Sequence, residues 1–307
     1  MTAGWVAPVV RGRALVRQQL GVEGARSLAS ATSWPVGRKL LANTYYGTEL
    51  TPDADRTEAR WAATEAAMWQ LRVLAGWAPP ASSRLARLFA GPVEIGNIAG
   101  HLAALQDDRP SRPVALGSLG TVWPAIANAS SGDQVRSRLT RSSWGDPGGG
   151  EMTTVVFGLQ VSWLHRLLGA VRPANEIALG GLCILLTREQ FVFERPIADI
   201  TRRMIDGMVG VHWRSATSID ELARALPTPG TWPLESVSSP SDVWRAEVEW
   251  LHRTNDLARR LARPPRRGRD TLAAIMALLL LDLWLVHAAI EMVGRDPMSV
   301  EVFDVVA

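Results

Sequence analysis

The chain has 307 residues, of which 47% are hydrophobic and 21% charged, so it is long enough for two or three domains and too apolar for a disordered protein. The formal net charge is +3. The pI is nevertheless about 9.7 because Lys39 is the only lysine among 33 basic residues, and arginines stay charged to high pH. This kind of basicity gives little support to a nucleic-acid-binding protein, and we expect no nucleic-acid partner.

The N-terminal sequence MTAGWVAPVVRGR lacks the charged and apolar regions of a secretory signal. The single cysteine, Cys183, cannot form an internal disulfide. Both features indicate the cytoplasm.

The first long helix is predicted over 55–77, where Trp61, Met68, Leu71 and Ala75 fall on one face. A proline pair shortly after this segment ends the helix.

Another helix is predicted over 155–170. No series of alternating strands accompanies it, and only 191–193 briefly suggests a strand. The sequence therefore predicts an all-α fold.

A further helix is predicted over 242–262. Trp244, Val248 and Leu251 form its apolar stripe, Ser241 is its expected N-cap, and a proline pair follows it.

The segment 271–292 is long and apolar enough to cross a bilayer, and six arginines at 259–269 precede it. Asp282 lies in its middle, and a central Asp costs about 2.5–3.5 kcal/mol on insertion scales. The composition leaves two interpretations open, a helix buried in protein and a membrane span. The arginines suit either a solvated helix end or a contact with anionic lipid headgroups or nucleic acid.

A similar order of features occurs three times along the chain. Each unit has a glycine turn after a short helix, then a Trp-bearing helix, then a helix with one acid among apolar residues. The turns contain Gly47, Gly145 and Gly230, and the acids are Glu94, Glu176 and Asp282. A glycine at a helix end lets the chain reverse direction, so the order predicts repeated helical bundles.

Sequence motifs for catalysis are nearly absent. The five histidines form no HExxH pattern, no phosphate-binding glycine loop is present, and the apolar neighbours of Cys183 predict an unreactive thiol. Asp107 and Asp108 resemble half of an aspartate-rich magnesium motif, but Ser111 occupies the next ligand position and Pro110 breaks the helix. A helical magnesium-dependent lyase or transferase is the enzymatic alternative; otherwise we expect no catalysis, metal or cofactor.

Four motifs occur in order along the chain. They are VVRGRALVRQQL at 9–20, Thr44 with Tyr46 and Gly47, Glu94 with Asn97 and Ile98, and LGSLG at 116–120. In these motifs and in the order of its repeats, the chain resembles the C subunits of the bacterial and archaeal V/A-type rotary ATPases, the counterparts of the d subunit in the eukaryotic V-ATPase. The resemblance extends over essentially all residues. In the second and third units Leu179 and Leu285 occupy the place of the asparagine, and the third turn has no aromatic residue before its glycine.

The resemblance implies three pseudo-symmetric helical bundles, at 1–112, 113–187 and 188–307, that form a funnel around a central cavity. It implies a non-catalytic protein on the cytoplasmic face of the membrane, peripheral to it. Its partners would be the rotor stalk subunits and the proteolipid ring, and its role would be to couple ATP chemistry to proton or sodium transport. No small-molecule substrate is implied, and 271–292 would be a helix buried in protein.

The residues expected to contact these partners lie in the acid helices and glycine turns. They are Tyr46, Gly47, Glu94, Asn97, Trp144, Gly145, Glu176, Gly230 and Asp282. Alternatively, the three acids form hydrogen bonds or ion pairs between helices inside each bundle. The alternative to a peripheral coupling protein is a membrane protein that is anchored by a transmembrane helix at 271–292.

Overall fold

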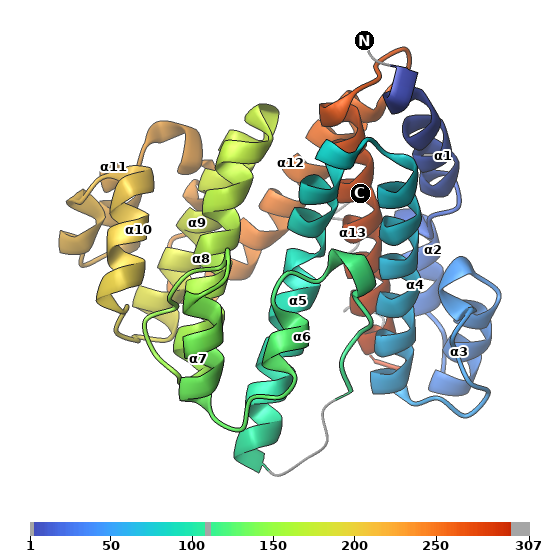
Figure 1. Cartoon of the computed structure of the whole chain (residues 1–307), viewed down its shortest axis with the longest axis horizontal. Coiled ribbons are helices and arrows are strands. Elements are labelled where there is room, and N and C mark those ends of the chain that lie inside the picture. The colour runs from blue at the N-terminus through green and yellow to red at the C-terminus, as the bar shows by residue number, and fades with distance from the viewer. Residues whose placement is uncertain (1–2, 108–111, 296–307) are drawn as a thin grey trace. The chain divides into compact units, whose positions relative to one another are not determined.

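The computed structural model describes residues 3–107 and 112–295, and 75% of it is helical (Figure 1). No strand occurs among these residues, which confirms the all-α prediction. The segment that suggested a strand instead contains a π-helical turn, Arg188–Val192, where the N–H of Phe193 bonds to the carbonyl of Arg188 at 2.8 Å.

The described chain forms two compact units. Unit 1 contains residues 3–90, 114–119 and 254–295, and unit 2 contains 91–107, 112–113 and 120–253. The chain passes from one unit to the other inside two helices, α5 and α12, and also at both ends of the segment 114–119. The predicted repeat boundaries at 112 and 187 remain a prediction, as does an arrangement of three bundles around a cavity.

Unit 1 is built around α13, the more apolar of the two long apolar helices, α5 and α13. Its helices are α1 (Val6–Val16), α2 (Gly21–Ala29), α3 (Trp34–Ala42), α4 (Arg56–Trp77), the start of α5 (Ser83–Asp107), the end of α12 (Val243–Ala262) and α13 (Arg269–Met292). α13 packs against α1, α2 and α4 (Figure 1). Ile275, Met276, Leu279, Val286 and Ile290 are almost completely buried, because the helix is surrounded by its neighbours.

The helix predicted over 55–77 is α4. Asp55 is its N-cap, and a capping box links the Asp55 side chain to the N–H of Glu58 and the Glu58 side chain to the N–H of Asp55. Met68 and Leu71 are buried as expected, and alanines between them widen the buried face. Small alanine side chains allow α4 to approach α13 closely.

Unit 2 contains two hydrophobic cores that share one helix. Its helices are the remainder of α5, α6 (Trp123–Ile126), α7 (Gly132–Thr140), α8 (Met152–Ala170), α9 (Asn175–Thr187), α10 (Asp199–Val209), α11 (Ile219–Ala225) and the start of α12 (Val243–Ala262). Val155 and Leu159 of α8 belong to a core with α5, α6 and α7. Phe157, Val161 and Leu164 of the same helix belong to a core with α9 to α12. α8 is therefore buried on two faces.

α5 begins at Ser83 and continues through Pro92, two residues before Glu94. Two details of the helix predicted over 242–262 were wrong. Trp244 is exposed rather than part of the α12 stripe, because the buried face uses Val243 and Ala246 instead. The expected N-cap, Ser241, lies inside a 3₁₀ turn, Pro240–Asp242, that precedes α12.

Candidate functional site

Asp282, at the middle of α13, is 3% exposed and accepts three hydrogen bonds within unit 1. The N–H of Leu20 lies 3.0 Å from Oδ2, the N–H of Gly21 lies 2.7 Å from Oδ1, and the Tyr46 hydroxyl lies 2.7 Å from Oδ2. Leu20 is the N-cap of α2 and Gly21 its first residue, so the carboxylate caps a helix that is distant in sequence. The acid thus joins three segments of unit 1.

The same contacts set the protonation of this pair. Burial raises the pKa of Asp282, and the hydrogen bonds from Tyr46, Gly21 and Leu20 oppose that rise, together with the charge of Arg259. Burial, and then the charge of Asp282, raises the pKa of Tyr46 well above its ordinary value. Tyr46 is therefore a hydrogen-bond donor throughout the physiological range.

Glu94, on α5, is 1% exposed and accepts four hydrogen bonds within unit 2. Its Oε1 accepts from the backbone N–H groups of Thr121, Val122 and Trp123 at 2.6, 2.8 and 2.9 Å. Its Oε2 accepts from the indole N–H of Trp144 at 3.0 Å. Burying a carboxylate is costly unless such bonds compensate, so this constellation holds the segment at α6 firmly to α5.

The turns that supply Tyr46 and Trp144 have the same local geometry. The Thr44 hydroxyl accepts from the N–H of Tyr46 at 3.2 Å and donates to the end of α3 at 2.7 Å. The Ser142 hydroxyl accepts from the N–H of Trp144 at 3.1 Å and donates to the end of α7 at 2.7 Å. In each turn a hydroxyl two residues before the aromatic residue therefore fixes its backbone.

The glycines that follow the aromatic residues have different reasons to be glycine. A Cβ atom on Gly47 would lie 2.5 Å from the backbone of Ala42, so a side chain has no room there. Gly145 has φ of 81°, which L-residues rarely adopt, and has open space around it. One glycine permits a close approach and the other a left-handed turn.

The third turn lacks both groups that fix the first two. In register with Gly47 and Gly145, Gly230 follows Pro229 at the aromatic position and Pro227 at the hydroxyl position. Gly230 still packs on α9, where an added Cβ would lie 2.7 Å from that of Leu179. Glu176, one turn earlier on α9, is exposed. The third turn therefore offers no aromatic donor to Glu176, the second of the three acids, which stays at the surface.

The three turns follow one pairing rule within their units. The first turn pairs with the third acid helix, α13, the second with the first, α5, and the third with the second, α9. Each turn therefore contacts the acid helix of another repeat and not the acid helix of its own repeat.

The structure brings most of the predicted residues into these contacts. Tyr46 and Asp282 meet, Trp144 and Glu94 meet, and Asn97 is buried one turn after Glu94. For Glu94 and Asp282 the hydrogen bonds join helices and turns of the chain itself, as the alternative interpretation expected. Contact of these residues with partner proteins remains a prediction.

Sequence reasoning missed the backbone donors at Leu20, Gly21 and 121–123. A backbone N–H is present at every residue except proline, so no residue type marks these positions. It also missed the contacts that hold Trp144: the Ser162 hydroxyl donates to its carbonyl at 2.9 Å, and the Arg166 guanidinium lies 4.6 Å from its ring centroid.

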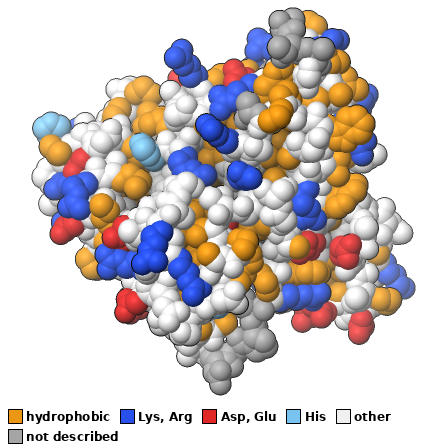
Figure 2. Space-filling view, viewed as in Figure 1, with side chains coloured by type: hydrophobic (Ala, Val, Ile, Leu, Met, Phe, Trp, Pro, Cys, Tyr) orange, Lys and Arg blue, Asp and Glu red, His pale blue; other side chains and the backbone are white. Residues whose placement is uncertain are grey.

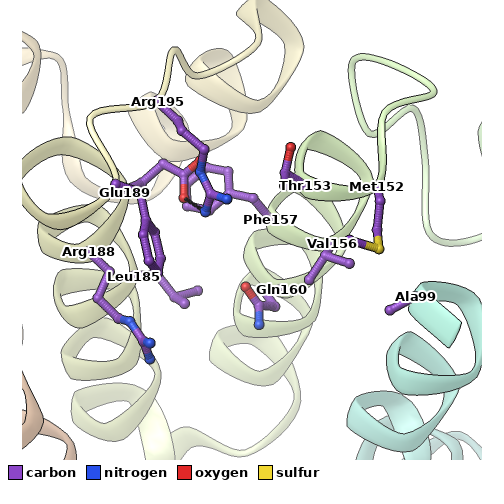
Figure 3. A pocket seen from close by; sticks show the side chains of 11 residues that line it. Ala99, Met152, Thr153, Val156, Phe157, Gln160, Leu185, Arg188, Glu189 and Arg195 are labelled. Carbon is purple, nitrogen blue, oxygen red and sulfur yellow. Dashed lines mark hydrogen bonds and ion pairs between the residues drawn. The ribbon is translucent and has the colours of Figure 1, made fainter. Parts of the chain in front are cut away.

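A cavity of about 360 Å³ lies in unit 2 between α8 and the π-helical turn (Figure 3). It is lined by Ala99, Met152, Thr153, Val156, Phe157, Gln160, Leu185, Arg188, Glu189, Phe193 and Arg195. The Arg195 guanidinium forms a two-point ion pair with the buried Glu189, with distances of 3.0 and 2.7 Å. π-helical turns are frequent at functional sites, and φ of Glu194 is 51°, an uncommon value for a residue other than glycine.

The charges at this cavity are paired within the chain. Arg188 contacts Glu247 at 2.5 Å, and the guanidiniums of Arg188 and Arg195 lie 5.5 and 4.3 Å from the Phe193 ring centroid. Burial raises the pKa of Glu247, and the charge of Arg188 opposes that rise. The cavity is therefore an apolar space edged by neutralised arginines.

The residues considered for catalysis in the sequence analysis form no catalytic or metal site among the described residues. Among residues 3–107 and 112–295, no cluster of three or more His, Cys, Asp or Glu side chains could hold a metal. Asp107 ends α5, whereas Asp108, Pro110 and Ser111 lie outside the described residues. Burial raises the pKa of the Cys183 thiol to about 12.

Among the residues that the structure describes, two helices have the length and hydropathy of a membrane span, α5 and α13. Of the most apolar window of α13, 67% is buried inside the structure, compared with 50% for α5. Core helices of globular proteins pass the same test, so these two helices are weak evidence for a membrane span.

No protein-family description matches the chain, and no curated protein matches it significantly.

Proposed function

We propose that this chain is a non-catalytic coupling protein of a V/A-type rotary ATPase. It would link the central rotor stalk to the proteolipid ring and so couple ATP chemistry to proton or sodium transport. The observation that carries the proposal is the pair of buried acid contacts, Asp282 with Tyr46 and Glu94 with Trp144. Thr44, Tyr46, Gly47 and Glu94 are also residues on which the resemblance to the rotary-ATPase family rests.

A coupling protein must transmit torque without yielding. Each buried carboxylate ties a turn, a loop or helix start, and a long helix together through three or four hydrogen bonds. Removing one partner of such a group leaves a buried charge or donor unsatisfied, which costs several kcal/mol. These contacts therefore resist small displacements, and closely packed helices add to that stiffness.

Three helical bundles around a cavity that receives the stalk are part of this proposal. The three turns, each paired with an acid helix, favour a repeated design. The weaker third contact, at Gly230 and Glu176, implies that the three bundles are unequal in stiffness.

The test is purification of the tagged chain from membranes of its native organism under mild detergent. We expect the stalk subunits and the proteolipid to be recovered with it. Membranes from a deletion strain should hydrolyse ATP without pumping ions, and the intact gene should restore pumping. A chain that is recovered alone, or a deletion strain with normal pumping, refutes the proposal.

The hydropathy of α13 favours one alternative, a protein anchored by that helix. Carbonate extraction separates the two proposals, because a peripheral protein is released and a spanning protein is retained. The three hydrogen bonds to Asp282 and the burial of its neighbours favour release.

A further inference from the structure

An arginine-rich segment of unit 1 lies at the end of α12, in the loop after it and at the start of α13. It contains six exposed arginines, Arg259, Arg260, Arg263, Arg266, Arg267 and Arg269. The loop is held to α1 by Arg13, whose Nε donates to the carbonyl of Ala262 at 2.8 Å and whose Nη2 donates to the carbonyl of Arg266 at 2.5 Å. The backbone between α12 and α13 is thus fixed on α1.

Most of these arginines have no acidic partner. Within the residues that the structure describes, no carboxylate lies in ion-pair distance of Arg260, Arg263, Arg266 or Arg267. Elsewhere arginines are paired, as in Arg136 with Asp146 at 2.8 Å. The segment therefore presents uncompensated positive charge.

Exposed hydrophobic side chains belong to the same end of unit 1. Val10 is 53% exposed and lies one helical turn before Arg13, on the same side of α1. Trp77, at the end of α4, is 57% exposed, and the Arg11 guanidinium lies 5.4 Å from its ring centroid. Figure 2 shows arginine and hydrophobic side chains next to one another over the end of the molecule that carries α1.

We propose that this surface, formed by Val10, Arg11, Arg13, Trp77 and the arginines at 259–269, binds anionic phospholipid headgroups at a membrane surface. Arginine attracts the phosphates, and tryptophan and valine sit at the boundary between headgroups and acyl chains. Lipid suits the surface better than single-stranded nucleic acid, because Arg11 covers a face of Trp77 on which a base would stack. The inference deepens the proposed peripheral location but depends only on this chain and lipid.

The experiment is sedimentation of the purified full chain with vesicles. One set is phosphatidylcholine alone, and the other contains one third phosphatidylglycerol. We expect binding to the anionic vesicles only, weakening as salt is added. Each arginine near such a surface contributes about fivefold in binding, so the variant R263Q/R266Q/R267Q should bind about 100-fold more weakly.

A matched control removes the same number of charges elsewhere. Arg141, Arg172 and Arg203 are exposed residues of unit 2, and the variant R141Q/R172Q/R203Q should bind as the wild type does, to within about twofold. Replacing Trp77 with Ser should also weaken binding. Far-UV circular dichroism checks that all variants are folded.

Three results would overturn the inference. They are equal binding to neutral and anionic vesicles, equal losses in the two triple variants, and binding to single-stranded RNA without binding to vesicles. The vesicles hold no ATPase subunits, so failure here leaves the coupling proposal intact. Binding to vesicles by a chain that never copurifies with a rotary ATPase refutes the coupling proposal alone.

Discussion

The replacement Glu94→Gln should destabilise unit 2 more than its small size suggests. The Gln carbonyl can take the place of Oε1 and keep the three backbone hydrogen bonds, but the amide then points its N–H groups at the indole N–H of Trp144. A hydrogen bond to a charged group contributes about 1.5–3 kcal/mol, compared with about 1 kcal/mol for a neutral one. Loss of the Trp144 bond and weakening of the other three should lower the free energy of unfolding by about 3 kcal/mol.

The assay is urea unfolding followed by far-UV circular dichroism, fitted with a separate transition for each unit if two appear. Glu176→Gln is the matched control, because that acid is exposed, and we expect a change within about 0.5 kcal/mol. In a double-mutant cycle with Trp144→Phe, the coupling to Glu94→Gln should be about 1–2 kcal/mol. A Glu94→Gln variant as stable as the wild type, or a control equally destabilised, would refute the reasoning.

Three further predictions concern His287, Gly47 and Cys183. Burial lowers the pKa of His287 from 6.5 to about 4, so between these pH values the unfolded chain binds a proton that the folded chain does not. The free energy of unfolding should therefore fall by up to about 3 kcal/mol as the pH is lowered from 6.5 to 4. The urea midpoint of His287→Gln should depend less on pH over this range. Gly47→Ala should cost more than about 2 kcal/mol in thermal or urea unfolding, since its Cβ would lie 2.5 Å from the backbone of Ala42, whereas Gly76→Ala, with open space, should be neutral or stabilising. Because burial raises its thiol pKa to about 12, Cys183 should react with a thiol reagent only when urea unfolds unit 2, and rapid labelling of the folded chain would contradict this.

Much of the helical content could be predicted because it is encoded locally. The capping box of α4 involves Asp55 and Glu58, three residues apart, and the apolar period that follows them is legible in the sequence. The prediction that Trp244 lies on the buried face of α12 was wrong. Trp244 is the largest apolar residue in the first turn of that helix, but the residues buried there are Val243 and Ala246. Size alone did not identify the face.

The candidate site was predicted in its residues but not in its pairing. Glu94, Asp282, Tyr46 and Trp144 were all singled out, yet Tyr46 and Asp282 are 236 residues apart, and periodicity carries no information on which turn meets which helix. The division into two units inside α5 and α12 was likewise hidden, because both helices continue without a break in their pattern. Such pairings follow from the tertiary packing of the whole chain.

Because most donors to the two buried acids are backbone N–H groups, the donor positions tolerate substitution better than the acids and their aromatic partners do. Five of the seven hydrogen bonds received by Glu94 and Asp282 come from main-chain N–H groups, at Leu20, Gly21 and 121–123. At the non-glycine donor positions, evolution is free to exchange one side chain for another without breaking these bonds, with proline as the one forbidden residue. These hydrogen bonds therefore constrain the side chains of the carboxylates and of their aromatic donors, whereas a backbone donor such as Val122 is constrained in its side chain only by the core in which it is buried.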